Sequence, residues 1–149
     1  MTTRSVIAFL TGQSDPASNA LSEDQRAFLD RLSFLPDEKF ARNFPYRSVP
    51  RPFRKIPLLT ASLNNSLQYL RSRQPRFAAT HRDEIIRTFS PYDRVIFLAG
   101  SCGLELFSNL HLPADFTAKA HVFAYGPVSR NLPRCATLWR VQGSGDRIS

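Results

Sequence analysis

One short segment of this 149-residue sequence has the residue types that a covalent catalyst needs. An apolar run, Val95–Ala99, leads straight into Gly100-Ser101-Cys102-Gly103, and apolar residues resume after it. Small residues around a serine, between a strand and a helix, are typical of the sharp turn that presents a nucleophilic hydroxyl at the edge of a sheet. An ordinary tight turn has the same composition. The pattern favours Ser101 as a nucleophile for acyl transfer.

Here the sequence resembles the α/β-hydrolase family. The family motif puts small residues two positions before and two positions after the nucleophile, following a central strand, and Ala99 and Gly103 hold these positions around Ser101. Centring the motif on Cys102 would put Leu104 where a small residue is required, so Ser101 is the better nucleophile. The resemblance implies a serine esterase or thioesterase in which the Cys102 backbone N–H donates to the oxyanion.

The resemblance also assigns roles to residues elsewhere in the chain. If Ser5–Leu10 matches the family's third strand, the backbone N–H of Gln13 is the second oxyanion donor and Gly12 lies beside the substrate. Gly12 also fits an ordinary turn. Asp146 follows the penultimate strand, where the family often places the acid that orients the catalytic histidine. Its surroundings, Gly-Ser-Gly-Asp, are a common turn composition as well.

The expected catalytic histidine is missing from its place, because the family's histidine follows the last strand and only three residues follow Asp146. His121 opens a predicted strand and His111 ends a predicted helix, so both are expected far from Ser101. His81, at a predicted helix start, is the remaining candidate base. Three explanations stay open: a shortened hydrolase without its last strand and histidine, a degenerate member that binds without cleaving, or an enzyme with an unusual base. In the first two cases this short chain is inactive.

Hydrophobic periodicity predicts one α/β domain over residues 1–149. The expected strands are Ser5–Leu10, Lys39–Phe44, Arg94–Ala99, His121–Tyr125 and Thr137–Val141. The expected helices run from Glu23 to about Leu35, around Leu63–Leu70, from Thr80 to Phe89 and over Cys102–Leu110. This alternation predicts a three-layer sandwich with a mostly parallel sheet of about five strands. Ligands bind at the carboxyl ends of such strands, so Phe44 and Tyr46 are expected either to line a substrate pocket or to pack in the core.

The positive charge is concentrated in the middle of the chain. The segment from Arg42 to Arg87 has ten basic and two acidic residues, an excess equal to the net charge of +8 of the whole chain. We expect residues 47–90, an Arg- and Pro-rich loop with helices, to form a lid that favours a small or carrier-bound anionic acyl substrate. The alternative function is a non-catalytic module that binds an anionic ligand or partner through this basic segment. No nucleic-acid motif is present, so nucleic acid is not an expected partner.

The composition argues against several other classes of protein. No apolar run approaches the ~20 residues of a membrane span, so no membrane partner is expected. Cys102 and Cys135 lie far apart without a CxxC or histidine pair, which argues against structural zinc or a disulfide scaffold and favours the cytoplasm. No nucleotide or zinc-protease motif is present, and we expect no metal or cofactor. An uncovered sheet edge would favour a homo-oligomer that covers it.

Overall fold

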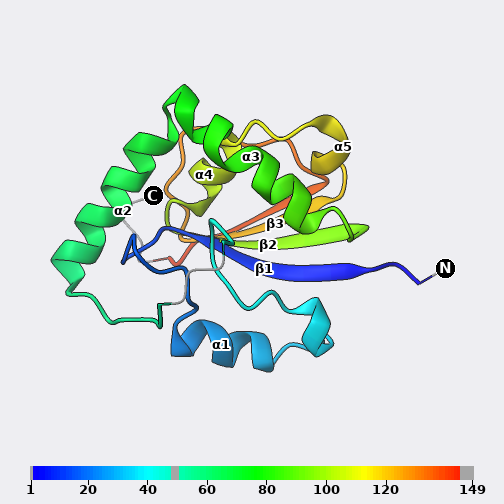
Figure 1. Cartoon of the computed structure of the whole chain (residues 1–149), viewed down its shortest axis with the longest axis horizontal. Coiled ribbons are helices and arrows are strands. Elements are labelled where there is room, and N and C mark those ends of the chain that lie inside the picture. Colours follow the sequence, from blue (N-terminus) through cyan, green and yellow to red (C-terminus); the bar gives the residue numbers. More distant parts are fainter. Residues whose placement is uncertain (1, 48–50, 145–149) are drawn as a thin grey trace.

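The computed structural model describes residues 2–47 and 51–144 and has an α/β fold (Figure 1). Its sheet has four parallel strands in the order in which they occur along the chain. They are β1 (Ser5–Thr11), β2 (Arg94–Gly100), β3 (Ala120–Tyr125) and β4 (Thr137–Val141). The α/β class and the parallel sheet confirm the prediction, with one strand fewer than the five expected among the described residues.

The missing strand is the one expected at Lys39–Phe44. Lys39 makes a single parallel bridge to Ile7, and Arg42 makes a single antiparallel bridge to Ala20, but no continuous ladder forms. Further along the segment, Asn43 turns its carboxamide onto β1 and the chain bends through Pro45. The segment therefore touches the β1 edge of the sheet without extending it.

The helices form layers around the sheet. They are α1 (Glu23–Asp30), α2 (Leu58–Ser72), α3 (Pro75–Phe89), α4 (Gly103–Asn109) and α5 (Ala114–Thr117), with a 3₁₀ turn η1 (Pro36–Glu38). Figure 1 shows α3, α4 and α5 on one face of the sheet and α1 on the other. In the same view α2 lies beyond the left-hand end of the sheet, where β1 ends. No helix of the described residues is long and apolar enough to cross a membrane.

The end of α1 and the start of α3 differ clearly from the expected helix boundaries. The first helix starts as predicted, with a capping box between Ser22 and Gln25, but it stops at Asp30, where the N–H groups of the next two residues bond to carbonyls three residues back. The helix expected to open at Thr80 begins at Pro75 instead, because proline at the first position has a preset φ and needs no hydrogen-bond acceptor. Thr80 lies inside α3, where its hydroxyl donates to the Arg76 carbonyl.

The core is built on both faces of β1 and β2. Alternate residues of the strands face α3, α4 and α5 in one large buried cluster, which includes Val6, Phe97 and Val122. The intervening residues, such as Phe9 and Leu98, face α1 in a smaller cluster. Burial on both faces explains the continuous apolar runs of these strands. β2 is an inner strand, with β1 and β3 on its two sides.

Candidate active site

The turn between β2 and α4 holds Ser101 in a strained backbone conformation. Ser101 has φ 53°, and it is one of three non-glycine residues with positive φ in the described part of the chain. Its carbonyl accepts a 2.9 Å hydrogen bond from the Val128 N–H, which fixes the bend from the outside. The residue is exposed, and it directly follows Gly100, the last residue of β2. The bend therefore presents the serine at the carboxyl end of an inner strand, and such strain is common at functional sites.

Packing explains the small residues around this serine. A Cβ added to Gly103 would collide with the backbone oxygen of Leu10, so the first turn of α4 lies directly against β1. A Cβ added to Gly100 would press on the ring of Tyr125 on the neighbouring strand. Ala99 is fully buried. The close approach of helix and strand requires glycine at position 103, as the nucleophile motif does.

The neighbouring cysteine is suited to contribute only its backbone. Burial of the Cys102 thiol raises its pKa to about 11, an effect opposed by a hydrogen bond from its own backbone N–H. The thiol is therefore protonated at neutral pH, and a protonated thiol is a poor nucleophile. Its sulfur points toward Gly12, where an added Cβ would come within 2.7 Å of it. Of the two adjacent candidates, the exposed Ser101 hydroxyl is the better placed to react.

A cavity of about 440 Å³ opens at Ser101, and α2 forms one wall of it. The wall includes Asn65, which sequence reasoning missed because a single amide on a helix belongs to no motif. The Asn65 Oδ1 atom is buried over Gly12 and has no hydrogen-bond partner in the described structure. An unpaired buried acceptor costs free energy, and this oxygen is enclosed between α2 and the Gly12 turn. The cavity thus pairs a strained serine with an unsatisfied polar atom.

The second expected oxyanion donor is engaged by α2. The Gln13 backbone N–H donates to Gln68 Oε1 at 2.7 Å, and the Gln68 amide donates back to Gln13 Oε1 at 3.2 Å. Gln13 Nε2 also donates to the Ser18 carbonyl at 2.9 Å. In this arrangement the Gln13 N–H cannot serve an oxyanion until Gln68 withdraws.

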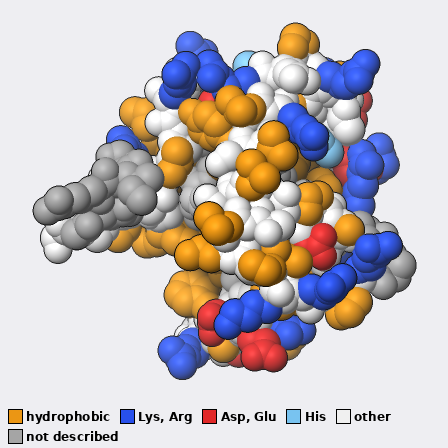
Figure 2. Space-filling view, turned by 90° about the vertical axis from the view of Figure 1, so that its left-hand side faces the viewer, with side chains coloured by type: hydrophobic (Ala, Val, Ile, Leu, Met, Phe, Trp, Pro, Cys, Tyr) orange, Lys and Arg blue, Asp and Glu red, His pale blue; other side chains and the backbone are white. Residues whose placement is uncertain are grey.

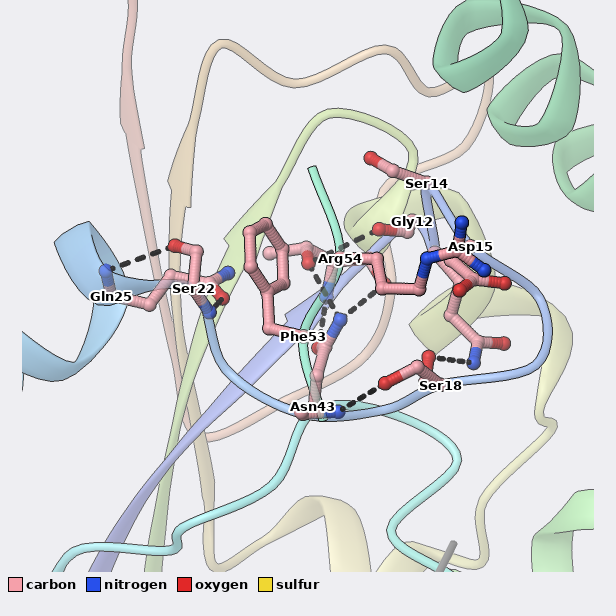
Figure 3. Close-up of a pocket in the computed structure, with 12 residues that line it drawn as sticks. Gly12, Ser14, Asp15, Ser18, Ser22, Gln25, Asn43, Phe53 and Arg54 are labelled. Atoms are coloured by element: carbon pink, nitrogen blue, oxygen red, sulfur yellow. Dashed lines mark hydrogen bonds between the residues drawn. The ribbon is translucent and has the colours of Figure 1, made fainter. Parts of the chain in front are cut away.

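A second cavity, of about 220 Å³, lies at the carboxyl end of β1 and includes Gly12 in its wall (Figure 3). Beneath it, Asn43 Nδ2 donates to Thr11 Oγ1 at 2.8 Å, while Asn43 Oδ1 accepts from the Thr11 N–H at 3.0 Å. Arg54, from the basic segment, lines the same cavity. A positive side chain therefore lies close to the Gly12-Gln13 turn.

The structure does not bring His81 and Ser101 into one cavity. His81 lies in the middle of α3, and its ring packs 5.0 Å from those of Phe44 and Phe77. Burial, and to a lesser extent Arg47, lowers the pKa of His81. Its Nδ1 atom is buried without a hydrogen-bond partner among the described residues. The residue lines a different cavity, and Gln13 lines that cavity too.

The other two histidines, which the sequence predicted to lie far from Ser101, are found at other ends of their elements. His111 lies past the far end of α4, and His121 lies at the second position of β3, bonded to Thr137 Oγ1 at 3.1 Å. None of the three histidines lines the cavity that holds Ser101. Asp146 lies outside the described residues.

Phe44 and Tyr46 belong to the core rather than to a pocket wall. They are 1% and 2% exposed, and their rings pack edge to face. The Tyr46 hydroxyl donates to the Phe9 carbonyl at 2.8 Å, and burial raises its pKa well above the ordinary value. Of the three residues expected to line a substrate pocket, Gly12 alone lines one of the cavities described above.

Sequence reasoning also missed a buried carboxylate behind the turn. Glu105 is 1% exposed, and its Oε2 accepts from Ser129 Oγ at 3.1 Å and from the Arg130 N–H at 2.9 Å. Its Oε1 accepts from Asn109 Nδ2 at 3.2 Å and lies 4.0 Å from Arg73 Nε. The sequence pattern that could have indicated its burial is an acidic residue surrounded by Leu104, Leu106 and Phe107. Glu105 fixes the connection between β3 and β4 against α4.

Comparison of the chain with protein-family models, with curated proteins and with solved structures gives no match.

Proposed function

We propose that this protein is a serine hydrolase of α/β-hydrolase type that transfers the acyl group of an ester or thioester to Ser101. The observation that supports the proposal is the Ser101 turn: an exposed serine with positive φ, at the carboxyl end of an inner parallel strand. Gly103 adds support, because its contact with Leu10 is the close helix–strand approach that a nucleophile turn needs.

In the proposed reaction, Ser101 Oγ attacks the carbonyl carbon of the substrate. A new C–O bond forms, the bond to the alcohol or thiol breaks, and the serine proton leaves with the departing group. Water then hydrolyses the acyl-serine. The Cys102 N–H turns from its own thiol to the oxyanion at the start of α4, and the Gln13 N–H joins it once Gln68 has withdrawn.

The described residues around Ser101 include no histidine that could act as its general base. An unactivated serine is a weak nucleophile at neutral pH. We therefore expect slow acylation of this chain, measurable with activated esters and phosphonates rather than with ordinary esters. The acid role remains assigned to Asp146 by the family resemblance alone.

The basic segment over residues 47–90 suggests the kind of substrate. It supplies Arg54 to the cavity beside Gly12 and places α2 over Ser101. We propose that it acts as a lid and favours an anionic acyl group or an anionic carrier. The free thiols of Cys102 and Cys135 are consistent with a cytoplasmic location.

Labelling with a fluorophosphonate probe tests the proposal, because the probe forms a covalent adduct with nucleophilic serines. We expect the wild type and Ser66→Ala to be labelled and Ser101→Ala to remain unlabelled. Ser66 is the matched control because it is an exposed serine that lines the same cavity. Labelling of none of the three proteins would contradict the nucleophile and leave the second candidate, a non-catalytic module that binds anions through Arg54 and its basic neighbours.

A further inference from the structure

Helix α2 presents its leucines to solvent. Leu58, Leu59, Leu63, Leu67 and Leu70 are 85%, 87%, 60%, 39% and 56% exposed. The last four are spaced four, four and three residues apart, so they lie along one side of the helix. Figure 2 shows hydrophobic side chains gathered on the face of the molecule to which α2 belongs. A surface helix normally turns such a row toward the core.

The opposite side of α2 holds it on the protein through polar groups. Asn64 Nδ2 donates to the Ser14 carbonyl at 2.7 Å, and Gln68 bonds the Gln13 N–H. At the end of the helix, Ser72 Oγ accepts from Asn109 Nδ2 at 3.0 Å. The helix is thus amphipathic, but it turns its polar side toward the protein and its leucines toward solvent. An outward apolar row of this kind marks an interaction surface.

The charged residues in the part of the sequence that contains the leucine row are all basic. From residue 39 to residue 82 the sequence has ten basic residues and no acidic residue. Six exposed ones lie at the two ends of α2: Arg51, Arg54 and Lys55 before it, Arg71 in its last turn, and Arg73 and Arg76 after it. The partner of this surface must therefore be both apolar and negatively charged.

We propose that α2 docks on an anionic lipid surface, with the leucine row at the boundary of headgroups and acyl chains and the flanking arginines against the lipid phosphates. The helix is about 22 Å long at 1.5 Å per residue, so it can lie in the plane of the interface but cannot span a bilayer. Basic residues at both of its ends suit a continuous anionic plane better than a single acidic groove. The expectation of no membrane partner rested on the lack of a long apolar run in the sequence. That observation excludes a spanning helix and does not exclude binding at the membrane surface. The inference goes beyond the acyl transfer at Ser101 and does not depend on it.

Sedimentation with lipid vesicles tests this proposal. The wild type should sediment with vesicles of phosphatidylcholine and phosphatidylglycerol, and only weakly with phosphatidylcholine alone. The triple variant Leu59→Ser, Leu63→Ser, Leu70→Ser should bind the anionic vesicles at least ~100-fold more weakly, since three leucines lose their apolar contact. The double variant Leu35→Ser, Leu132→Ser is the matched control, because these leucines are similarly exposed and belong to other segments of the chain. It should bind like the wild type, as should Ser101→Ala.

Three outcomes would overturn the proposal. Equal binding of the triple variant and the wild type would mean that the leucine row does not touch lipid. Equal binding to neutral and anionic vesicles would remove the role of the arginines. Failure to bind vesicles, together with leucine-dependent binding to an acidic polypeptide such as polyglutamate, would assign the surface to an acidic protein. Because all the substituted leucines are exposed, circular dichroism should show the same fold in every variant.

Discussion

Ser101 combines exposure with a backbone conformation that serine rarely adopts. Its φ of 53° lies in the left-handed region, and its carbonyl is tied to Val128. The adjacent Cys102 has a buried thiol that stays protonated at neutral pH. Two neighbouring residues with reactive side-chain types thus have opposite properties, because one points into solvent and the other into the core.

Replacing Ser101 with glycine should stabilise the fold and abolish labelling by the fluorophosphonate probe. Glycine has no Cβ to strain at positive φ, so the free energy of unfolding should rise by about 0.5–1 kcal/mol. Urea denaturation measures this change. As a control, Ser108→Gly in α4 should lower the free energy of unfolding, since glycine is unfavourable inside a helix. A loss of stability in Ser101→Gly would mean that the serine is not strained.

The Cys102 thiol should make stability depend on alkaline pH. Its pKa is about 11 in the folded chain, against an ordinary value of 9.0. Above about pH 9 the unfolded chain loses this proton and the folded chain keeps it, so stability falls as pH rises toward the folded pKa. The difference in free energy of unfolding between wild type and Cys102→Ser should therefore change by about 2 kcal/mol, to the disadvantage of the wild type, from about pH 8 to about pH 11. A difference independent of pH would contradict the raised pKa.

At the scale of elements, most strands could be predicted from the sequence, but the side of α2 that faces the rest of the protein could not. β4 was predicted with both its bounds, and β1 and β2 were each predicted to within one residue, because apolar runs between turn formers define buried strands. The strand expected at Lys39–Phe44 was wrong, since no ladder forms beyond Lys39. The leucine spacing of α2 predicted a helix correctly, but spacing alone cannot reveal which side is anchored.

The same limit applies to the candidate site. The Ser101 turn could be predicted, because its small residues are local to the sequence. The hydrogen bond between Gln68 and Gln13, 55 residues apart, could not, because it depends on where the fold places α2. His81 was expected at a helix start, but Pro75 begins that helix earlier and leaves His81 among aromatic rings.

Removing the contact between α2 and the Gln13 turn should speed labelling of Ser101. Gln68→Ala frees the Gln13 N–H for the oxyanion, and a hydrogen bond of ordinary strength corresponds to an increase of about 2- to 10-fold in rate. The time course of fluorophosphonate labelling measures it. Asn64→Ala is the matched control, because it also loosens α2 but does not touch Gln13. An equal change in both variants would attribute the effect to mobility of α2 rather than to the amide.

At the scale of the whole molecule, Glu105 connects parts of the chain that are distant in sequence. It joins α4 to the Ser129-Arg130 segment between β3 and β4, and it lies near Arg73 at the end of α2. On the other side of the sheet, Trp139 and Val141 of β4 are about half exposed at 50% and 48%. β4 is the last strand of the sheet. That a second copy of the chain covers the β4 edge stays a prediction.

Glu105→Ala should strongly destabilise the fold. It removes a buried carboxylate that accepts from the Arg130 N–H and the Ser129 hydroxyl, and hydrogen bonds to a charged group are strong, so the cost should be about 2–4 kcal/mol. Glu84→Ala, which removes an exposed ion pair with Arg87, should cost at most about 1 kcal/mol. Urea denaturation of both variants measures the contrast. Similar small losses in the two proteins would show that Glu105 does not hold the β3–β4 connection.

Capture of an acyl-enzyme tests the central claim most directly. The protein is incubated with p-nitrophenyl acetate, and the acetylated residue is then located by tandem mass spectrometry. We predict that acetyl accumulates on Ser101, and that Ser101→Ala carries no more acetyl than the urea-unfolded chain. Acetyl spread over other residues of the folded protein, with Ser101 unmodified, would contradict the claim that the turn after β2 presents a nucleophile.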